Sequence, residues 1–365
     1  MNNTDNFTKK DTLAIKALAV MLMIIHHLFA FPDKFSEGVS LNNLIILSDG
    51  SPLSEIAGNY GKLCVALFMM LSGYGLYISH KNSDGNVTAT VLKRIKVVYI
   101  KYWQVFFVMI PLGIIIGVEK VSVSWSTMLK NFLAIETTVN DEWWFMTLYV
   151  IMLFLFPIII TWVDRKNANF LKDFVYLLLF NTFVNTALLT FTQTNAYMAS
   201  FNGTYFWQKM SVALVMLPMF AIGCLLAKYD VISLVLKKVT DRLFRIFLGI
   251  GLLILTITLR QSWAMRSNWG WDRLDYIYAA IFTIAFTLIL YNTKKIKDVL
   301  AFIGAQSTGI WLIHTFLCYY YFHEVFFAVK FPILVFLLTF SVSLLLSWVI
   351  SYVCHRVWSI FSKIS

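Results

Sequence analysis

Two ionisable residue types stand inside the first apolar stretch of the chain. Residues 15–28 read IKALAVMLMIIHHL, with Lys16 near one end and two histidines near the other. An ionisable side chain inside hydrocarbon is costly, so its presence there suggests a function. At about 100° per residue, Lys16 and His27 differ by only about 20° around a helix and lie roughly 16 Å apart along it. His26 is about 80° away from Lys16, and we therefore expect His27 to be the functional histidine.

The composition is typical of a membrane protein. Of the 365 residues, 59% are hydrophobic and only 13% are charged, whereas a soluble domain carries about 25% charged residues. Apolar windows of about 20 residues mark transmembrane helices. No soluble-sized segment interrupts them, so the predicted fold is an all-α polytopic bundle with a single domain, residues 1–365. We predict ten spans, at roughly 13–31, 60–79, 97–117, 143–163, 173–192, 208–227, 243–260, 274–292, 307–323 and 333–354.

The positive charges follow a membrane topology. Nineteen lysines and arginines fall near the termini and in the even-numbered loops, but only seven fall in the odd-numbered loops. Basic residues gather on the cytoplasmic side, so we expect both termini to be cytoplasmic. The net charge of +11 is then a topology signal, and we expect no nucleic-acid partner. On this topology Arg260 lies in the seventh, external loop.

Four segments resemble, in the same order, segments of the membrane acyltransferase-3 family. Lys16 and His27 resemble its Arg-x10-His signature in the first span, although lysine stands where the family has arginine. Residues 68–74 (FMMLSGY) are similar to its second-span Phe-x-x-x-Ser-Gly-Tyr/Phe stretch, and residues 143–145 (WWF) are similar to its Trp-Phe entering the fourth span. Residues 307–314 (STGIWLIH) resemble its Ser-x-x-x-Tyr/Trp-Leu-x-His near the ninth span. Together these segments cover most of the chain.

The resemblance implies a bacterial cell-membrane enzyme that transfers an acyl group, usually acetyl, from cytoplasmic acetyl-coenzyme A to a hydroxyl of a surface or exported carbohydrate. It implies that His27 is catalytic, and a neutral imidazole can indeed take the proton of a hydroxyl. Lys16 would orient a reactant or bind the donor. His314 is either a second polar group of the site or a satisfied core histidine. A basic cluster could, with Lys16, hold the donor's phosphates or serve only as a topology signal: Lys93, Arg94 and Lys96.

Candidate acceptor-binding residues lie in two predicted external loops: Glu142, Trp144, Trp269 and Trp271. Tryptophan could stack on a sugar face, but it is also common at membrane interfaces, and acidic residues are favoured at a helix N-terminus in any case. Ser72 and Gly73 have no histidine or carboxylate near them in sequence. Small residues in a span more often permit close helix packing, and packing is the interpretation that we favour for them.

A transporter or flippase of glycan or lipid-linked sugar is the alternative class of function. Ion-coupled transporters usually carry carboxylates inside the bundle, whereas the 19 acidic residues here fall in loops, tails or span ends. A facilitator without ion coupling, or an enzyme that acetylates an amino group, stays open. The four cysteines lie in or at the ends of apolar spans and read as small buried hydrophobes, so we expect neither disulfides nor a metal site.

Overall fold

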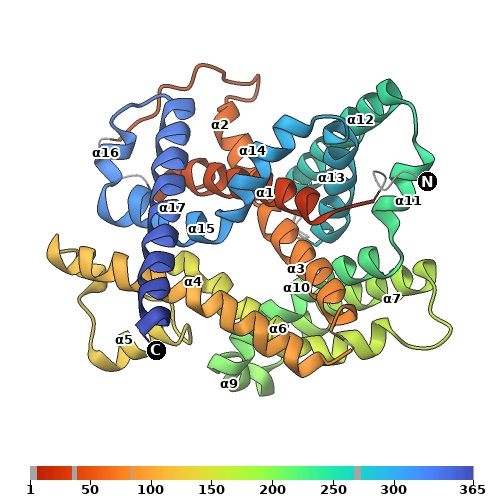
Figure 1. Cartoon of the computed structure of the whole chain (residues 1–365), viewed down its shortest axis with the longest axis horizontal. Helices are drawn as coiled ribbons and strands as arrows, with labels where there is room; N and C mark the ends of the chain where they lie inside the picture. The colour runs from red at the N-terminus through yellow and green to blue at the C-terminus, as the bar shows by residue number, and fades with distance from the viewer. Residues whose placement is uncertain (1–5, 35–38, 84, 267–272, 365) are drawn as a thin grey trace. The chain divides into compact units, whose positions relative to one another are not determined.

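The chain is largely helical in the computed structural model, which describes residues 6–34, 39–83, 85–266 and 273–364 (Figure 1). Within these ranges no β-strand forms, and the only bridge joins Ile46 and Pro52. The α-helices are α1 (Lys9–Phe29), α2 (Leu53–Gly61), α3 (Leu63–Lys81), α4 (Val87–Ile115), α5 (Trp125–Phe132), α6 (Trp144–Val163), α7 (Phe170–Thr182), α8 (Leu189–Thr194), α9 (Ala199–Asn202), α10 (Tyr205–Lys228), α11 (Val231–Lys238), α12 (Arg242–Arg266), α13 (Asp275–Leu290), α14 (Lys294–Ala305), α15 (Ser307–Thr315), α16 (His323–Phe327) and α17 (Pro332–Ile364).

Shorter helical turns of other types connect or interrupt these helices. The 3₁₀ turns are η2 (Pro32–Lys34), η3 (Glu119–Val121), η4 (Asp141–Trp143) and η6 (Ala196–Met198). Two segments are π-helical, η5 (Phe183–Leu188) and η7 (Phe316–Tyr321). Such π turns are rare and often mark functional sites, and η7 follows directly on the histidine-bearing α15.

Eight helical segments among the described residues are long and apolar enough to cross a membrane: Lys9–Phe29, Leu53–Lys81, Val87–Ile115, Asp141–Val163, Phe170–Thr194, Tyr205–Lys228, Arg242–Ser262 and Pro332–Arg356. The pair α14 and Ser307–Tyr321, bent by 55°, would make a ninth. The apolar helix α13 is shorter, with 16 residues. The predicted all-α, polytopic fold class is confirmed. The count of ten spans and the cytoplasmic termini stay predictions.

The described residues group into two compact units. Unit 1 draws on the chain up to Lys16, Val65–Ile95 and Thr147–Ala301; unit 2 draws on Ala17–Cys64, Lys96–Met146 and Phe302–Ser365. The chain passes from one unit to the other within helices such as α1 and α4, not through a linker. The single domain over residues 1–365 stays a prediction.

In unit 1 the helices α3 and α10 pack backbone to backbone. A Cβ atom added to Gly73 of α3 would overlap the carbonyl oxygen of Phe220, and one added to Gly223 of α10 would overlap that of Met70. Glycine allows helices to approach this closely in a membrane. The contact supports the packing interpretation of the Ser72–Gly73 pair. Ser72 itself hydrogen-bonds through its side chain to Tyr149 of α6.

Arg260 belongs to a helix of unit 1, so the prediction that it lies in an external loop was wrong. The helix α12 continues to Arg266, and the side chain of Arg260 is fully buried. Its Nε and Nη2 donate to the two carboxylate oxygens of Asp275, at 2.8 and 2.9 Å. This paired geometry offsets the cost of burying both charges. The hydropathy pattern ended the span at Arg260 because hydropathy takes no account of the Asp275 carboxylate, which neutralises the arginine.

The basic cluster of α4 is also helical rather than part of a loop. We predicted a span from residue 97, but α4 begins ten residues earlier, at Val87. In a helix, Arg94 and Lys96 differ by about 200°. The guanidinium of Arg94 and the ammonium of Lys96 therefore lie on nearly opposite faces of α4.

In unit 2 two helices approach their neighbours at glycines. The helix α2 lies against the end of α1, where a Cβ on Gly58 would be only 2.6 Å from the backbone nitrogen of Ala30. The helix α15 lies against α17 at Gly309, where an added Cβ would meet the side chain of Ser347. These contacts hold the last turn of α1 and the whole of α15 within one unit.

Candidate functional site

His27 and His314 are hydrogen-bonded to each other in unit 2. His27 lies in the last turn of α1, and His314 lies near the end of α15. The Nδ1 atom of His27 is 2.7 Å from Nε2 of His314, and their stacked rings have centroids 4.9 Å apart. His314 is fully buried, whereas His27 is partly exposed. The imidazole of His27 is therefore held by a second imidazole that is fully buried.

The surroundings of His314 determine which nitrogens carry hydrogens. Its Nδ1 faces the carbonyl oxygens of Trp311, at 2.8 Å, and Ile310, at 3.2 Å. A carbonyl only accepts, so Nδ1 of His314 is the donor, and Nε2 of the neutral ring is an acceptor. Nδ1–H of His27 must then donate to it. The lone pair of His27 is thus on Nε2, the nitrogen that is left to take a proton.

His26 has a different partner from His27. Its Nδ1 donates to the carbonyl oxygen of Gly58 at 2.9 Å, and its side chain is buried. This bond joins α1 to α2 at Gly58, where the two backbones approach closely. We therefore interpret His26 as a structural residue, because its Nδ1–H is already used in the bond to Gly58.

A charged network lies beside the histidine pair. Glu142 is buried and accepts from Lys34 Nζ through Oε1, at 2.9 Å, and from the hydroxyl of Tyr320 through Oε2. The Lys34 ammonium also lies 4.8 Å from the ring centroid of Tyr319, and that ring is 6.2 Å from the ring of His27. The carboxylate of Glu142 therefore holds an ammonium close to His27.

The turn that carries Glu142 is bound to α15 by its neighbours. Trp143 is fully buried, and its Nε1 donates to the carbonyl oxygen of Leu312 at 3.0 Å. Asn140 and Thr315 exchange hydrogen bonds of 2.9 and 3.1 Å. The segment that resembled a Trp-Phe motif thus positions both Glu142 and the histidine-bearing helix. Trp144 is only partly buried, and its ring lies beside that of the adjacent Phe145.

Lys16 and Arg94 form a second group of predicted site residues, in unit 1. Both are partly buried, and the charge of Arg94 acts directly on Lys16. The guanidinium lies against Gly75, 3.7 Å from where a Cβ would be. Among the described residues neither side chain has an ion pair or hydrogen bond. Lys93 and Lys96 are exposed, so the structure brings only Arg94 of the predicted cluster to Lys16.

Two predicted site residues, Trp269 and Trp271, lie outside the described residues.

The sequence reasoning also missed some residues of the site. Lys34 was counted only as a loop charge, although it follows His27 by seven residues, or about two helical turns. Tyr319 and Tyr320 were not singled out, although a run of three tyrosines that begins five residues after a motif histidine is unusual in an apolar span.

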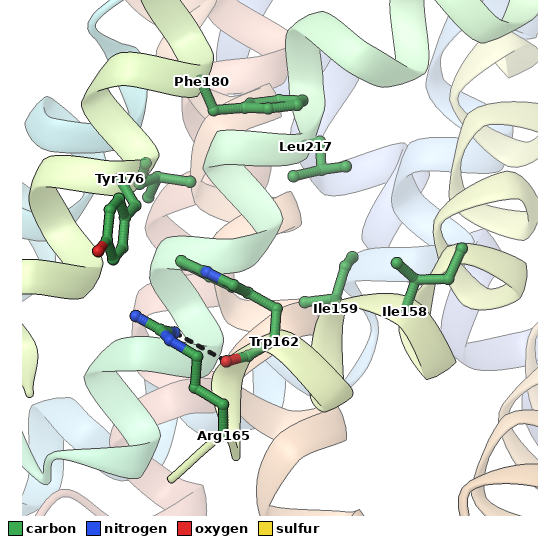
Figure 2. Close-up of a pocket in the computed structure, with 8 residues that line it drawn as sticks. Ile158, Ile159, Trp162, Arg165, Tyr176, Phe180 and Leu217 are labelled. Carbon is green, nitrogen blue, oxygen red and sulfur yellow. Dashed lines mark hydrogen bonds between the residues drawn. The ribbon is translucent and has the colours of Figure 1, made fainter. Parts of the chain in front are cut away.

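A separate pocket lies in unit 1, between α6, α7 and α10 (Figure 2). It measures about 560 Å³ and is lined by Ile158, Ile159, Trp162, Arg165, Tyr176, Leu177, Phe180 and Leu217. Arg165 donates to the carbonyl oxygen of Trp162 at 2.8 Å and pairs with the buried Asp173. Its lining is mostly apolar, and the one charged side chain in it, Arg165, is engaged by these two partners. Within the described ranges no three acidic, histidine or cysteine residues gather as a metal site would require.

Of three comparisons with known proteins, one finds a match. Neither the search of curated proteins nor the search of solved structures finds a match. A family model described as an acyltransferase domain matches residues 14–352, a range that includes Lys16, the histidine pair and the Glu142 turn. With its apolar helices, the chain is a multi-pass membrane acyltransferase, and it belongs to the acyltransferase-3 family.

Proposed function

We propose that the protein is an O-acetyltransferase of the bacterial cell membrane, which transfers acetyl from cytoplasmic acetyl-coenzyme A to a hydroxyl of a surface or exported glycan. The observation that carries this proposal is the imidazole of His27, whose Nδ1–H is held by His314. An imidazole fixed in one tautomer by a partner is the arrangement that makes a poor nucleophile reactive.

His27 then acts as the general base. Its Nε2 takes the proton of the acceptor hydroxyl while the hydroxyl oxygen attacks the thioester carbonyl carbon. A carbon–oxygen bond forms, the carbon–sulfur bond breaks, and the coenzyme A thiolate leaves with the bonding pair. The proton on Nε2 passes to that thiolate, which restores neutral His27. His314 is a positioning residue in this scheme, because its Nε2 accepts from His27 throughout.

Lys16 and Arg94 are the residues that we propose to hold the phosphates of the donor. Two cations that lie together without an anion among the described residues favour a ligand of opposite charge.

Arg94→Gln should weaken donor binding, because it removes one of the two cations. We expect the apparent donor constant to rise roughly 10-fold, the worth of about one charge-assisted hydrogen bond, with the acceptor constant unchanged. The double variant Lys93→Gln/Lys96→Gln is the matched control and should bind the donor as the wild type does. Binding of acetyl-coenzyme A to detergent-purified protein is the measurement. Equal affinity of all three proteins would remove Arg94 from the donor site.

The acceptor would bind near the network of Lys34 and Glu142. The Lys34 ammonium is about half exposed, so it can contact a hydroxyl or an acidic group of a glycan while Glu142 holds it in place. Trp144, two residues further along the chain, is partly exposed and could stack on a sugar ring. Glu142 itself already accepts two hydrogen bonds, so we assign it chiefly to the support of Lys34.

Mass spectrometry of surface glycan from cells with and without the protein tests the proposed function. We expect each repeat to gain about one acetyl group with the wild-type protein and none with His27→Asn at matched expression. Unmodified glycan in all three samples would refute O-acetylation of glycan. A change in the amount of exported glycan, without any change in its mass, would instead favour a transporter.

A further inference from the structure

Three consecutive tyrosines of η7 reach three different parts of unit 2. The hydroxyl of Tyr319 donates to the backbone carbonyl of His27 at the end of α1. The hydroxyl of Tyr320 donates to Glu142 and accepts from the backbone nitrogen of Asp141 at 3.3 Å. The hydroxyl of Tyr321 donates to the carbonyl of Met109 in α4 at 2.7 Å. A single turn thus joins α1, the Glu142 turn and α4.

His27 is held twice by the same short segment. Its ring bonds to His314, and its backbone carbonyl bonds to Tyr319, five residues further along the chain. In a regular α-helix, residues five apart differ by about 140° and could not both reach one neighbour. A π turn, with its i→i+5 hydrogen bonds, brings residues at this spacing towards the same side. The π-helical form of η7 is therefore what allows both bonds to His27.

We propose that Tyr319 is a positioning residue of the acetyl-transfer reaction, and that the π turn η7 is the device that aligns the base. This inference rests on the proposed role of His27. The ring bond alone leaves the imidazole free to swing with the end of α1, where the backbone carbonyls have no partner within the helix. The Tyr319 bond removes that freedom. The Lys34 ammonium over the Tyr319 ring brings the same tyrosine into contact with the charged network.

Alignment of this kind affects turnover more than binding. A misplacement of about 1 Å between reacting groups can cost about 10² in rate. Loss of the Tyr319 hydroxyl leaves the ring and its packing in place, so the helix end should loosen without unfolding. We therefore expect Tyr319→Phe to lower kcat by roughly 10- to 100-fold and to leave both KM values within about twofold.

The matched control is Tyr321→Phe. It removes the same atom from the same turn and also frees one backbone carbonyl, but that carbonyl is in α4 and not at His27. We expect its kcat to stay within about twofold of the wild type. The assay follows release of coenzyme A from acetyl-coenzyme A by purified protein, with glycan extracted from the cells that make the protein as acceptor. The thermal midpoint in detergent should be alike for the two variants.

A double-mutant cycle separates positioning from a structural effect. Tyr319 acts through His27, so Tyr319→Phe should have no further effect on the residual rate of His27→Asn. A structural role would lower the residual rate by the same factor as in the wild type, and that result would overturn the inference. So would an unchanged kcat in Tyr319→Phe alongside a large loss in His27→Asn. If His27→Asn itself keeps full activity, the proposed base fails, and the role of Tyr319 fails with it.

Discussion

His27→Asn is expected to lower acyl-transfer turnover by roughly 10²–10⁴-fold, the usual worth of a positioned general base. The asparagine amide can still donate to Nε2 of His314 from about the position of the lost Nδ1–H. The substitution therefore removes the lone pair of Nε2 and little else. Protein yield and thermal midpoint in detergent should match the wild type, because the bond that ties α1 to α15 is retained.

His26→Asn is the matched control for this prediction. Its amide can replace the Nδ1–H that donates to the Gly58 carbonyl, 2.9 Å away in the wild type, so both activity and fold should survive. His26→Ala leaves that carbonyl without its donor, and we expect it to lower the free energy of unfolding by about 1–3 kcal/mol with little loss of turnover. A larger loss of turnover in His26→Asn than in His27→Asn would show that the wrong histidine has been chosen.

Gly73→Leu should have the largest effect on folding. A side chain at this position overlaps the Phe220 carbonyl, and backbone cannot move aside as the end of a flexible side chain can. Overpacking typically costs about 1–3 kcal/mol and occasionally more, and we expect the upper end or beyond here. Leucine is a better helix former than glycine, so any loss must come from the helix contact. The measurement is the monodisperse fraction and the thermal midpoint in detergent.

Gly251→Leu makes the same substitution in the same unit at a position where an added Cβ meets nothing within 4 Å. It should fold as the wild type does. Ser72→Ala provides the complementary test of a nucleophile: it should keep most of the activity, since the side chain of the serine is engaged with Tyr149. Inactivity of a well-folded Ser72→Ala protein would revive the nucleophile interpretation, and normal stability of Gly73→Leu would contradict the close α3–α10 contact.

The parts of the site that follow regular helix geometry were accessible from the sequence. The 100° phase separated His27 from His26, and the structure gives them different partners. The apolar windows located the helical segments. The Ser-to-His segment led to His314, but only the tertiary contact shows that its Nε2 faces His27. Residue type and spacing predict which side chains share a face of a helix. A partner 287 residues away can be identified only from the folded structure.

The residues that sequence reasoning missed depend on irregular backbone or on a compensated charge. No pattern in residues 316–321 (FLCYYY) predicts a π turn. The sequence therefore could not show that His314 and Tyr319 both bond to His27. Arg94 was grouped with Lys93 and Lys96 because they are close in sequence, but α4 begins early and its helical phase separates them. Arg260 ended a predicted span because hydropathy treats every arginine as unpaired.

Because Arg260 and Asp275 are buried together, a rise in ionic strength should weaken other ion pairs of the protein more than this one. Dissolved ions weaken charge pairs only where they can approach them, within a Debye length of about 10 Å at 0.1 M salt. The pairs Lys81–Asp164 and Lys120–Asp141 have exposed partners and are screened as salt rises. The Arg260–Asp275 pair has neither partner in reach of solvent. Concentrated salt would therefore loosen the ion pairs at the rim of the protein while α12 and α13 stay joined.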